Sequence, residues 1–227
     1  MTIWFVTGTD TGVGKTITTA ALVIRLRADG GVPFVVKPAQ TGVGVDAPGD
    51  LDEVRRLIGP VPGYEGVRLR EPLAPTAAAR LEDVPLPSVE AQRDAILAAE
   101  VDHDVIVEGA GGILVPLGAG WNLLDLAQSV AHVGHVVRFL VVARAGLGTL
   151  NHTALTVQAI QHRDLDVAGV VIGSWPEDPD LAALHNLADL PTLTGVPFLG
   201  RIPAGAGELA PETFTARAAS WVDLAVR

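Results

Sequence analysis

Short, almost wholly apolar segments alternate with amphipathic segments along this 227-residue chain. The apolar segments are Ile3–Thr7, Phe34–Lys37, Asp104–Glu108, Phe139–Ala143, Val167–Ile172 and Pro197–Ile202. Strands that are apolar on both faces are typical of a parallel sheet covered on both sides. The alternation therefore limits the fold to the α/β class.

Helical spacing of apolar residues is found between and after these strands. The expected helices are Lys15–Ala28, Leu51–Ile58, Val89–Ala99, Leu123–Ala131, Leu150–Arg163, Pro179–Leu187 and Glu212–Val226. The stretch from Gly59 to Pro87 is rich in proline and glycine, and predicts loops with one short helix near Pro75–Arg80. We expect one domain over residues 1–227, a mostly parallel sheet with helices on both faces.

Composition excludes several classes of function. The chain carries 16 basic and 26 acidic residues, a net charge of −10, and no basic run, which argues against a nucleic-acid partner. No apolar run is long enough to span a membrane, and no signal peptide is apparent. The absence of cysteine excludes thiolate chemistry. These features fit a cytoplasmic protein.

The first strand leads into "VTGTDTGVGKT", Val6 to Thr16, and then into a helix. This is the context of a phosphate-binding P-loop, in which backbone N–H groups and the helix N-terminus surround phosphate. The usual pattern needs a glycine where Thr9 stands, and the nearest is Gly8. By this pattern Lys15 would hold the β- and γ-phosphates, and the Thr16 hydroxyl would bind Mg²⁺.

Ligands of open α/β sheets bind beyond the carboxyl ends of the strands, so the other strand ends are informative. Lys37 ends the strand in "FVVKPAQTG", and Glu108 ends the strand in "DVIVEGAGG". A carboxylate at Glu108 is suited to complete a Mg²⁺ shell that begins at Thr16. A second carboxylate would come from the segment after Lys37, where the residues alone leave Asp46, Asp50 and Asp52 as alternatives.

Lysine is used only twice in this chain, at Lys15 and Lys37, whereas 14 positions carry arginine. A compact ammonium fits inside a tight loop where the planar arginine fork does not. Both lysines are therefore candidates for contact with phosphate or a developing anion. A further loop, "GLGTLNHT", precedes a helix whose N-terminus could bind an anion, but the residues alone favour an ordinary helix cap.

Taken together, "VTGTDTGVGKT", "KPAQTG", "VEGAGG" and "GTLNH" resemble the dethiobiotin synthetase family, in this order and over essentially the whole chain. The early Gly8 is usual for that family's loop. The resemblance implies that ATP, Mg²⁺ and CO₂ are used to close a cyclic urea on 7,8-diaminononanoate. It implies a carbamate, then a mixed carbamic–phosphoric anhydride, then ring closure with release of ADP and phosphate.

The same resemblance implies roles for individual residues and a homodimer. Lys37 and Lys15 would be catalytic, and Thr16, Asp50 and Glu108 would bind the metal. Nucleotide contacts are expected from Gly12, Val13, Gly14, Lys15, Thr16, Ile17, Asp50, Glu108, Gly111, Gly173, Ser174, Pro203, Ala204 and Gly205. Substrate contacts are expected from Thr11, Lys37, Thr41, Ala110, Gly111 and, across the dimer, Gly148, Thr149 and Asn151.

Two points depart from this assignment or compete with it. The family often recognises adenine with an asparagine where this chain has Gly173, beside Ser174. The alternative function is a regulatory ATPase switch of the partitioning or metal-delivery kind, which shares a similar loop. Those proteins carry a lysine at the position of Asp10, and their membrane-binding members carry a basic amphipathic C-terminal helix, which the segment from Pro211 to Arg227 lacks.

Overall fold

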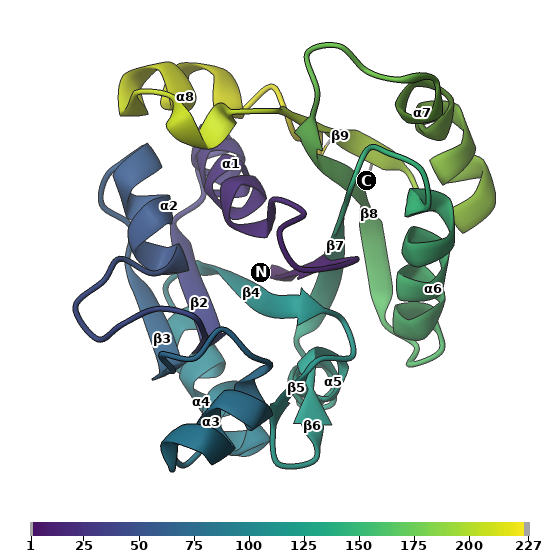
Figure 1. Cartoon of the computed structure of the whole chain (residues 1–227). Coiled ribbons are helices and arrows are strands. Elements are labelled where there is room, and N and C mark those ends of the chain that lie inside the picture. The colour runs from purple at the N-terminus through teal and green to yellow at the C-terminus, as the bar shows by residue number, and fades with distance from the viewer. Residues whose placement is uncertain (1, 225–227) are drawn as a thin grey trace.

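A seven-stranded, entirely parallel sheet forms the centre of the molecule, in a computed structural model that describes residues 2–224 (Figure 1). Its spatial order is β3-β2-β4-β1-β7-β8-β9. The strands are β1 (Thr2–Gly8), β2 (Pro33–Gln40), β3 (Gly63–Arg68), β4 (Asp104–Gly112), β7 (Val136–Ala143), β8 (Asp166–Trp175) and β9 (Phe198–Pro203). A separate antiparallel pair consists of β5 (Pro116–Gly118) and β6 (Trp121–Asn122).

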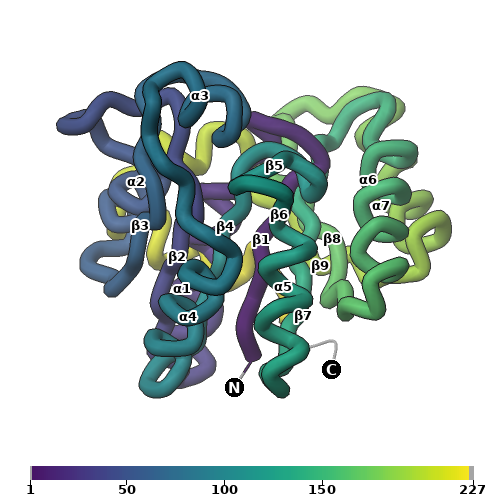
Figure 2. The backbone as a smooth tube through the Cα atoms, turned by 90° about the horizontal axis from the view of Figure 1, so that it is seen from below, coloured from purple at the N-terminus to yellow at the C-terminus, as the bar shows by residue number. Residues whose placement is uncertain are grey.

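Helices cover both faces of the sheet, as expected for the α/β class. They are α1 (Lys15–Ala28), α2 (Asp50–Ile58), α3 (Pro75–Glu82), α4 (Val89–Glu100), α5 (Leu123–Ala131), α6 (Thr149–Gln161), α7 (Leu181–Thr194) and α8 (Pro211–Ala218). The core cluster on one face includes buried residues of α1, α2 and α8. The cluster on the other face includes residues of α4, α5, α6 and α7, and of these helices α4, α5 and α6 lie toward the viewer in Figure 2.

The central strand shows why the apolar segments lie inside. Ile3 and Phe5 of β1 face one core cluster, whereas Trp4 and Val6 face the other. Phe5 pairs in register with Phe139 of β7, and their ring centroids are 5.3 Å apart. Complete burial of one such side chain contributes about 1.5–3 kcal/mol. Both faces of the strand therefore contribute to stability, and this explains the unbroken apolar runs of the sequence.

The fold class is confirmed, and the six expected strands are present, but two regions differ from the sequence prediction. The stretch after Gly59 contains β3, which was expected to be loop. Its Gly63 and Gly66 and its charged residues hide the pattern because β3 is an edge strand with partly exposed faces. The β5–β6 pair was also not predicted, since strands of two or three residues have no readable period.

Two helix ends were predicted wrongly. α7 begins after Asp180, whose side chain accepts a bond from the Ala183 N–H, and continues through Pro191 to Thr194. Burial of Leu190 on its inner face offsets the cost of the proline. The last helix was expected to end at Val226, which lies outside the described residues, but α8 ends at Ala218. The chain then turns back to the sheet, where Val222 bridges to Gly200.

Within residues 2–224, no helix is both long and apolar enough to cross a membrane.

Candidate active site

The phosphate-binding loop joins β1 to α1 at the carboxyl edge of the sheet. Gly12 and Gly14 have φ values of 72° and 98°, in the left-handed region that favours glycine. A Cβ on Gly14 would lie 2.3 Å from the Gly173 carbonyl oxygen, so the end of β8 packs directly on the loop. Gly14 is also the N-cap of α1, whose first N–H groups have no partner within the helix. The loop is therefore built to bind an anion.

Lys15 begins α1 and folds back over this loop. Its Nζ donates to the backbone carbonyl of Asp10 at 3.1 Å. Burial lowers the pKa of the Lys15 ammonium, and the positive charge of Lys37 lowers it further. The negative charge of an incoming phosphate would offset both effects, because it favours the charged form of the ammonium.

Lys37 lies at the point where β2 and β4 stop pairing. Pairing of β2 with β4 ends at Val36 and Val107, and the next residue on each strand is Lys37 and Glu108. The Lys37 Nζ lies 2.8 Å from Glu108 Oε1 and donates to the Gly109 carbonyl at 3.0 Å. The divergence of the two strands thus creates a buried position where an ammonium and a carboxylate meet.

Asp50 supplies a second carboxylate to the same ammonium. Its Oδ2 lies 2.5 Å from Lys37 Nζ. Burial alone would lower the pKa of Lys37, but Glu108 and Asp50 together outweigh burial and raise that pKa above its ordinary value. Burial would likewise raise the pKa of Asp50, and the Lys37 ammonium reverses this and holds it below its ordinary value. Both groups are therefore charged at neutral pH.

Among the three aspartates that the sequence left open, the structure separates the roles. Asp50 reaches Lys37, whereas Asp52 accepts a bond from the Gly49 N–H and caps its own helix, α2. Asp46 is exposed in the preceding loop. Only Asp50 among them faces the cluster around Lys37.

The donor set around Thr16 fits Mg²⁺. The Thr16 hydroxyl donates to Glu108 Oε1 at 3.0 Å, and a hydrogen bond to Thr16 helps to lower the pKa of Asp50. A hydroxyl and two carboxylates are hard oxygen ligands, and Mg²⁺ favours one or two carboxylates together with waters and phosphate oxygens. Within residues 2–224, no group of three or more histidine, aspartate or glutamate side chains could hold a metal by itself.

A cavity of about 740 Å³ lies above this cluster. Of the residues that the sequence predicted, it is lined by Thr11, Gly12, Gly14, Lys15, Thr16, Ile17, Lys37, Thr41, Asp50, Ala110 and Gly111. Glu108 lies buried behind Lys37, and Val13 packs into the core beneath the loop. Residues that were not predicted also line it: Ala39, Gln40, Pro72, Leu73, Ala74, Pro75 and Val115. The Pro72–Pro75 segment was missed because it follows β3, the strand that the sequence did not reveal.

Other predicted residues lie outside this cavity. Gly148 is the N-cap of α6, the Thr149 side chain is fully buried, and Asn151 is exposed. The loop before α6 is held by Asn186 of α7, which donates to the Ala145 carbonyl at 2.7 Å.

The residues expected to contact the base lie at the ends of β8 and β9. Gly173 touches the phosphate loop, Ser174 is exposed, and Gly205 begins a short 3₁₀ turn, Ala206–Glu208. Pro203 and Ala204 line a different cavity, of about 790 Å³, together with Trp175 and Arg201. The Arg201 guanidinium lies 4.7 Å from the centroid of the Trp175 ring.

The carboxylate of Asp10, in the phosphate loop, has a partner. Arg144, just after β7, donates to Asp10 Oδ2 at 2.6 Å, and the Thr11 N–H donates to Oδ1 at 2.7 Å. The pair joins the tip of the phosphate loop to the end of β7. Sequence reasoning missed Arg144, because nothing in the sequence links two residues so far apart.

Comparisons with known proteins show to which family the chain belongs. A family model described as an AAA domain matches residues 3–210. An "ATP-dependent dethiobiotin synthetase BioD" of Rhodococcus jostii is 50% identical over 225 residues, which cover 98% of this chain and 95% of that protein. A protein of the same name from Streptomyces avermitilis is 49% identical over 224 residues, covering 98% and 92%.

Solved structures of more distant proteins share the fold. A ParA family ATPase from Chlorobium tepidum superposes with a TM-score of 0.57 at 14% identity, over 96% of this chain and 97% of that one. The MinC:MinD cell division complex of Aquifex aeolicus gives a TM-score of 0.54, also at 14% identity, over 96% and 86%. These likenesses show the architecture alone. The curated relatives are 49–50% identical over nearly the whole length of the chain, and this shows that the chain belongs to the ATP-dependent dethiobiotin synthetase family.

Proposed function

We propose that this protein closes a cyclic urea on 7,8-diaminononanoate, using CO₂, ATP and Mg²⁺, and releases dethiobiotin, ADP and phosphate. One amine adds to CO₂ and loses a proton, giving a carbamate. A carbamate oxygen attacks the γ-phosphorus and ADP leaves. The second amine then attacks the carbamoyl carbon, loses its proton and expels phosphate. The names of the curated relatives and the buried Lys37 cluster beside the phosphate loop support this proposal.

The observation that carries the mechanism is the position of Lys37. Its ammonium is charged, buried and fixed by two carboxylates at the wall of the cavity. Phosphoryl transfer needs positioning and neutralisation of charge more than covalent help. Lys37 would therefore stabilise the negative charge that develops on the carbamate and the transferring group.

The other residues of the cavity divide into two sets. The loop from Gly12 to Thr16 and the Lys15 ammonium would bind the triphosphate, and Ile17 would flank it. Thr11, Thr41, Ala110 and Gly111 would contact the diamine or its carbamate. Thr16, Asp50 and Glu108 would hold Mg²⁺, which supplies positive charge to the phosphate oxygens when bound.

We also propose a homodimer in which the partner completes the substrate site. The start of α6, Gly148 to Asn151, does not line the cavity of its own chain. Leu147 beside it is 88% exposed, and Leu155 on α6 is also exposed. An exposed apolar surface next to a helix N-terminus suits an interface that presents N–H groups to the substrate carboxylate of the other subunit.

A direct assay tests the function against its rivals. The protein is incubated with ATP, Mg²⁺ and bicarbonate, with and without 7,8-diaminononanoate, and phosphate release is followed. We expect release that depends on the diamine, with dethiobiotin formed in equal amount. Phosphate release at the same rate with and without the diamine would favour a regulatory ATPase switch. Nucleotide binding without phosphate release would favour a nucleotide-binding module that catalyses no reaction.

A further inference from the structure

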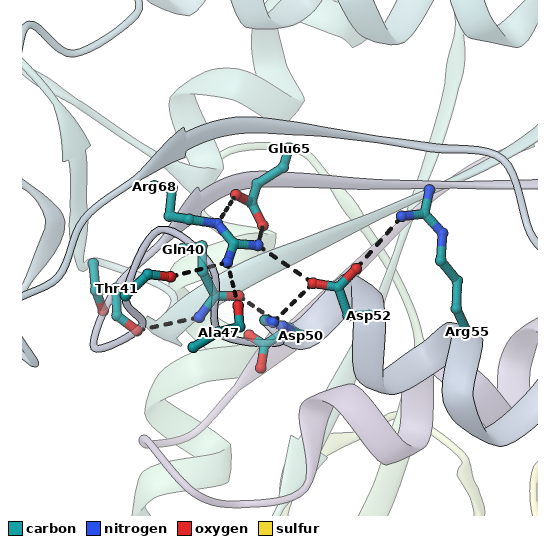
Figure 3. A network of polar contacts seen from close by, with 10 residues as sticks. Gln40, Thr41, Ala47, Asp50, Asp52, Arg55, Glu65 and Arg68 are labelled. Carbon is teal, nitrogen blue, oxygen red and sulfur yellow. Dashed lines mark hydrogen bonds and ion pairs between the residues drawn. The ribbon is translucent and has the colours of Figure 1, made fainter.

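Arg68, the last residue of β3, is held by five acceptors beside the active site (Figure 3). Its Nε and one Nη2 hydrogen bind both carboxylate oxygens of Glu65, at 2.7 and 2.9 Å. Nη1 donates to the carbonyls of Gly44 and Ala47, at 3.3 and 2.5 Å. Nη2 also donates to Asp52 Oδ2 at 3.4 Å. A guanidinium has five N–H donors, and all of them are used here.

These contacts join three parts of the chain. Glu65 belongs to β3, Gly44 and Ala47 to the loop between β2 and α2, and Asp52 to the first turn of α2. Asp52 in turn accepts the Gly49 N–H at 2.9 Å, and this contact lowers the pKa of Asp52. Arg68 thus fastens the loop and the start of α2 to the edge of the sheet.

Gln40 makes a second connection to the start of α2. It is the last residue of β2, is paired in register with Arg68, and is buried. Its Oε1 accepts the Asp50 N–H at 2.8 Å, and its Nε2 donates to the Thr41 carbonyl at 3.1 Å. The Asp50 N–H is one of the helix N–H groups that lack a partner within the helix. Gln40 therefore fixes the backbone of Asp50 directly.

Gly49, the N-cap of α2, fits between these two side chains. A Cβ at this position would lie 3.0 Å from both Arg68 Nη2 and Gln40 Oε1. The residue before Asp50 is thus enclosed by the same two side chains. Since a side chain can reach only as far as its backbone permits, the place of the Asp50 carboxylate depends on them.

From these contacts we propose that Arg68 and Gln40 are positioning residues, which set the place of the Asp50 carboxylate against Lys37 and toward the metal ligands Thr16 and Glu108. The proposal rests on the proposed function only in giving Asp50 a role in catalysis. Gln40 also lines the cavity, whereas Arg68 does not, but in the role proposed here both residues act through Asp50. Partners behind a metal ligand typically contribute about tenfold to a hundredfold in metal affinity or activity.

The chain offers a spectroscopic test, because Lys15 and Lys37 are its only lysines. Protein carrying ¹³C-labelled lysine gives one Cε signal for each, and Lys15→Arg assigns them. Spectra of the full-length protein are compared at one neutral pH, without nucleotide or metal. Asp50→Asn shows how far the Lys37 signal moves when the carboxylate charge is lost. Arg68→Met and Gln40→Met remove the proposed hydrogen bonds and keep an unbranched side chain, which has the length of glutamine and is shorter than arginine.

We expect both Met variants to move the Lys37 signal toward its place in Asp50→Asn, and to move the Lys15 signal less. Arg70→Met is the matched control, because Arg70 lies two residues on and its side chain is 67% exposed; its Lys37 signal should match the wild type. A wild-type Lys37 signal in both Arg68→Met and Gln40→Met would overturn the proposal. If Arg68→Met does not fold, Gln40→Met decides the matter alone.

Enzyme assays give an independent readout. The Mg²⁺ concentration for half-maximal activity should rise about tenfold to a hundredfold in Arg68→Met and Gln40→Met, and remain unchanged in Arg70→Met. An unchanged Mg²⁺ requirement in both variants would also overturn the proposal. A wild-type protein with no diamine-dependent activity would instead refute the proposed function, and the lysine spectra would still test the positioning of Asp50.

Discussion

Lys37 and Glu108 form an ion pair at 2.8 Å in which the two side chains are only 4% and 2% exposed. The pair joins β2 to β4 at the point where their backbone pairing ends. A charge in this position is costly unless its partner is present. The same contact therefore matters for stability as well as for chemistry.

Removing either partner should destabilise the fold strongly. Lys37→Met and Glu108→Gln should each lower the free energy of unfolding by about 3–5 kcal/mol, because the remaining group loses its main buried partner. The double variant should cost less than the sum of the two. Urea denaturation without nucleotide or metal measures all three, and strictly additive losses would contradict direct coupling.

Lys15 and Lys37 should fail in different ways when replaced. Lys15→Ala should weaken ATP binding, because Lys15 lies in the phosphate loop and would hold phosphate in the ground state. Lys37→Ala should lower kcat by about a hundredfold to a thousandfold with little change in nucleotide affinity. Calorimetry with ATP and steady-state kinetics separate the two effects. A near-normal kcat for Lys37→Ala would remove Lys37 from the mechanism.

The two lysines should titrate on opposite sides of their ordinary value of 10.5. Burial and Lys37 lower the pKa of Lys15, whereas Glu108 and Asp50 raise the pKa of Lys37. Because the folded pKa of Lys37 is raised, its contribution to stability is complete below pH 10.5 and is lost as pH rises through the folded value. Both lysines can be followed in ¹³C-lysine spectra of metal-free protein. The titration starts at about pH 8, roughly two units below the ordinary lysine pKa, and continues upward. Titration of Lys37 before Lys15 would refute this order.

The Asp50 carboxylate should make stability depend on pH in the acid range. Its folded pKa is held below the ordinary value of 3.8, mainly through Lys37 acting against burial. The stability that it contributes is therefore present above pH 3.8 and is lost as pH falls through the lower, folded value. Asp50→Asn should remove this part of the acid dependence. Denaturation curves of both proteins across that range show whether the difference between them disappears in acid.

Nucleotide selectivity should be weak. A Cβ on Gly173 would lie 2.1 Å from the Val13 carbonyl oxygen, so this position has no room for a side chain that reads the base. One neutral hydrogen bond is worth about 0.5–1.5 kcal/mol, so CTP, GTP and UTP should support turnover within about tenfold of ATP. The measurement is kcat/KM for the four nucleotides under one set of conditions. A preference for ATP of about a thousandfold would show that another group reads adenine.

Replacement of the exposed Leu147, beside α6, should change the oligomeric state. Leu147→Glu places a charge in the proposed interface, so we expect a monomer with little activity. Val136→Glu is the control. Val136 is also exposed, but it is the first residue of β7 and lies at the amino ends of the strands, whereas Leu147 follows the carboxyl end of β7. Light scattering at the assay concentration measures both. A fully active Leu147→Glu monomer would rule out a shared site.

Much of the fold could be predicted because the buried strands carry their own pattern. Ile3 to Thr7 is apolar on both faces, and both faces of β1 contact a core. The strand end at Lys37 was found because ligands gather at that edge of a parallel sheet. By contrast, β3 has partly exposed faces and a sequence pattern that resembles a loop.

The part of the site that sequence could not give consists of contacts between distant segments. The residues alone left Asp50 and Asp52 as alternatives, and which of them reaches Lys37 depends on the direction in which α2 begins, where Gln40 and Arg68 make hydrogen bonds. Arg144 reaches Asp10 only because β7 lies beside β1 in the sheet. Spacing along the chain holds no record of such neighbours, since they depend on the order of the strands.

The place of β4 between β1 and β2 also bears on how the protein is made. A nascent chain that ends before Asp104 can pair β2 with β3, but it has no strand to join β1 to β2. Until the ribosome adds β4, Lys37 lacks Glu108, and the backbone edges of β1 and β2 lack the strand that pairs with both. Parallel pairing between distant segments is slow and leaves apolar strands open to association. Arrival of β4 thus joins β1 to β2 and brings Glu108 to Lys37 in the same event.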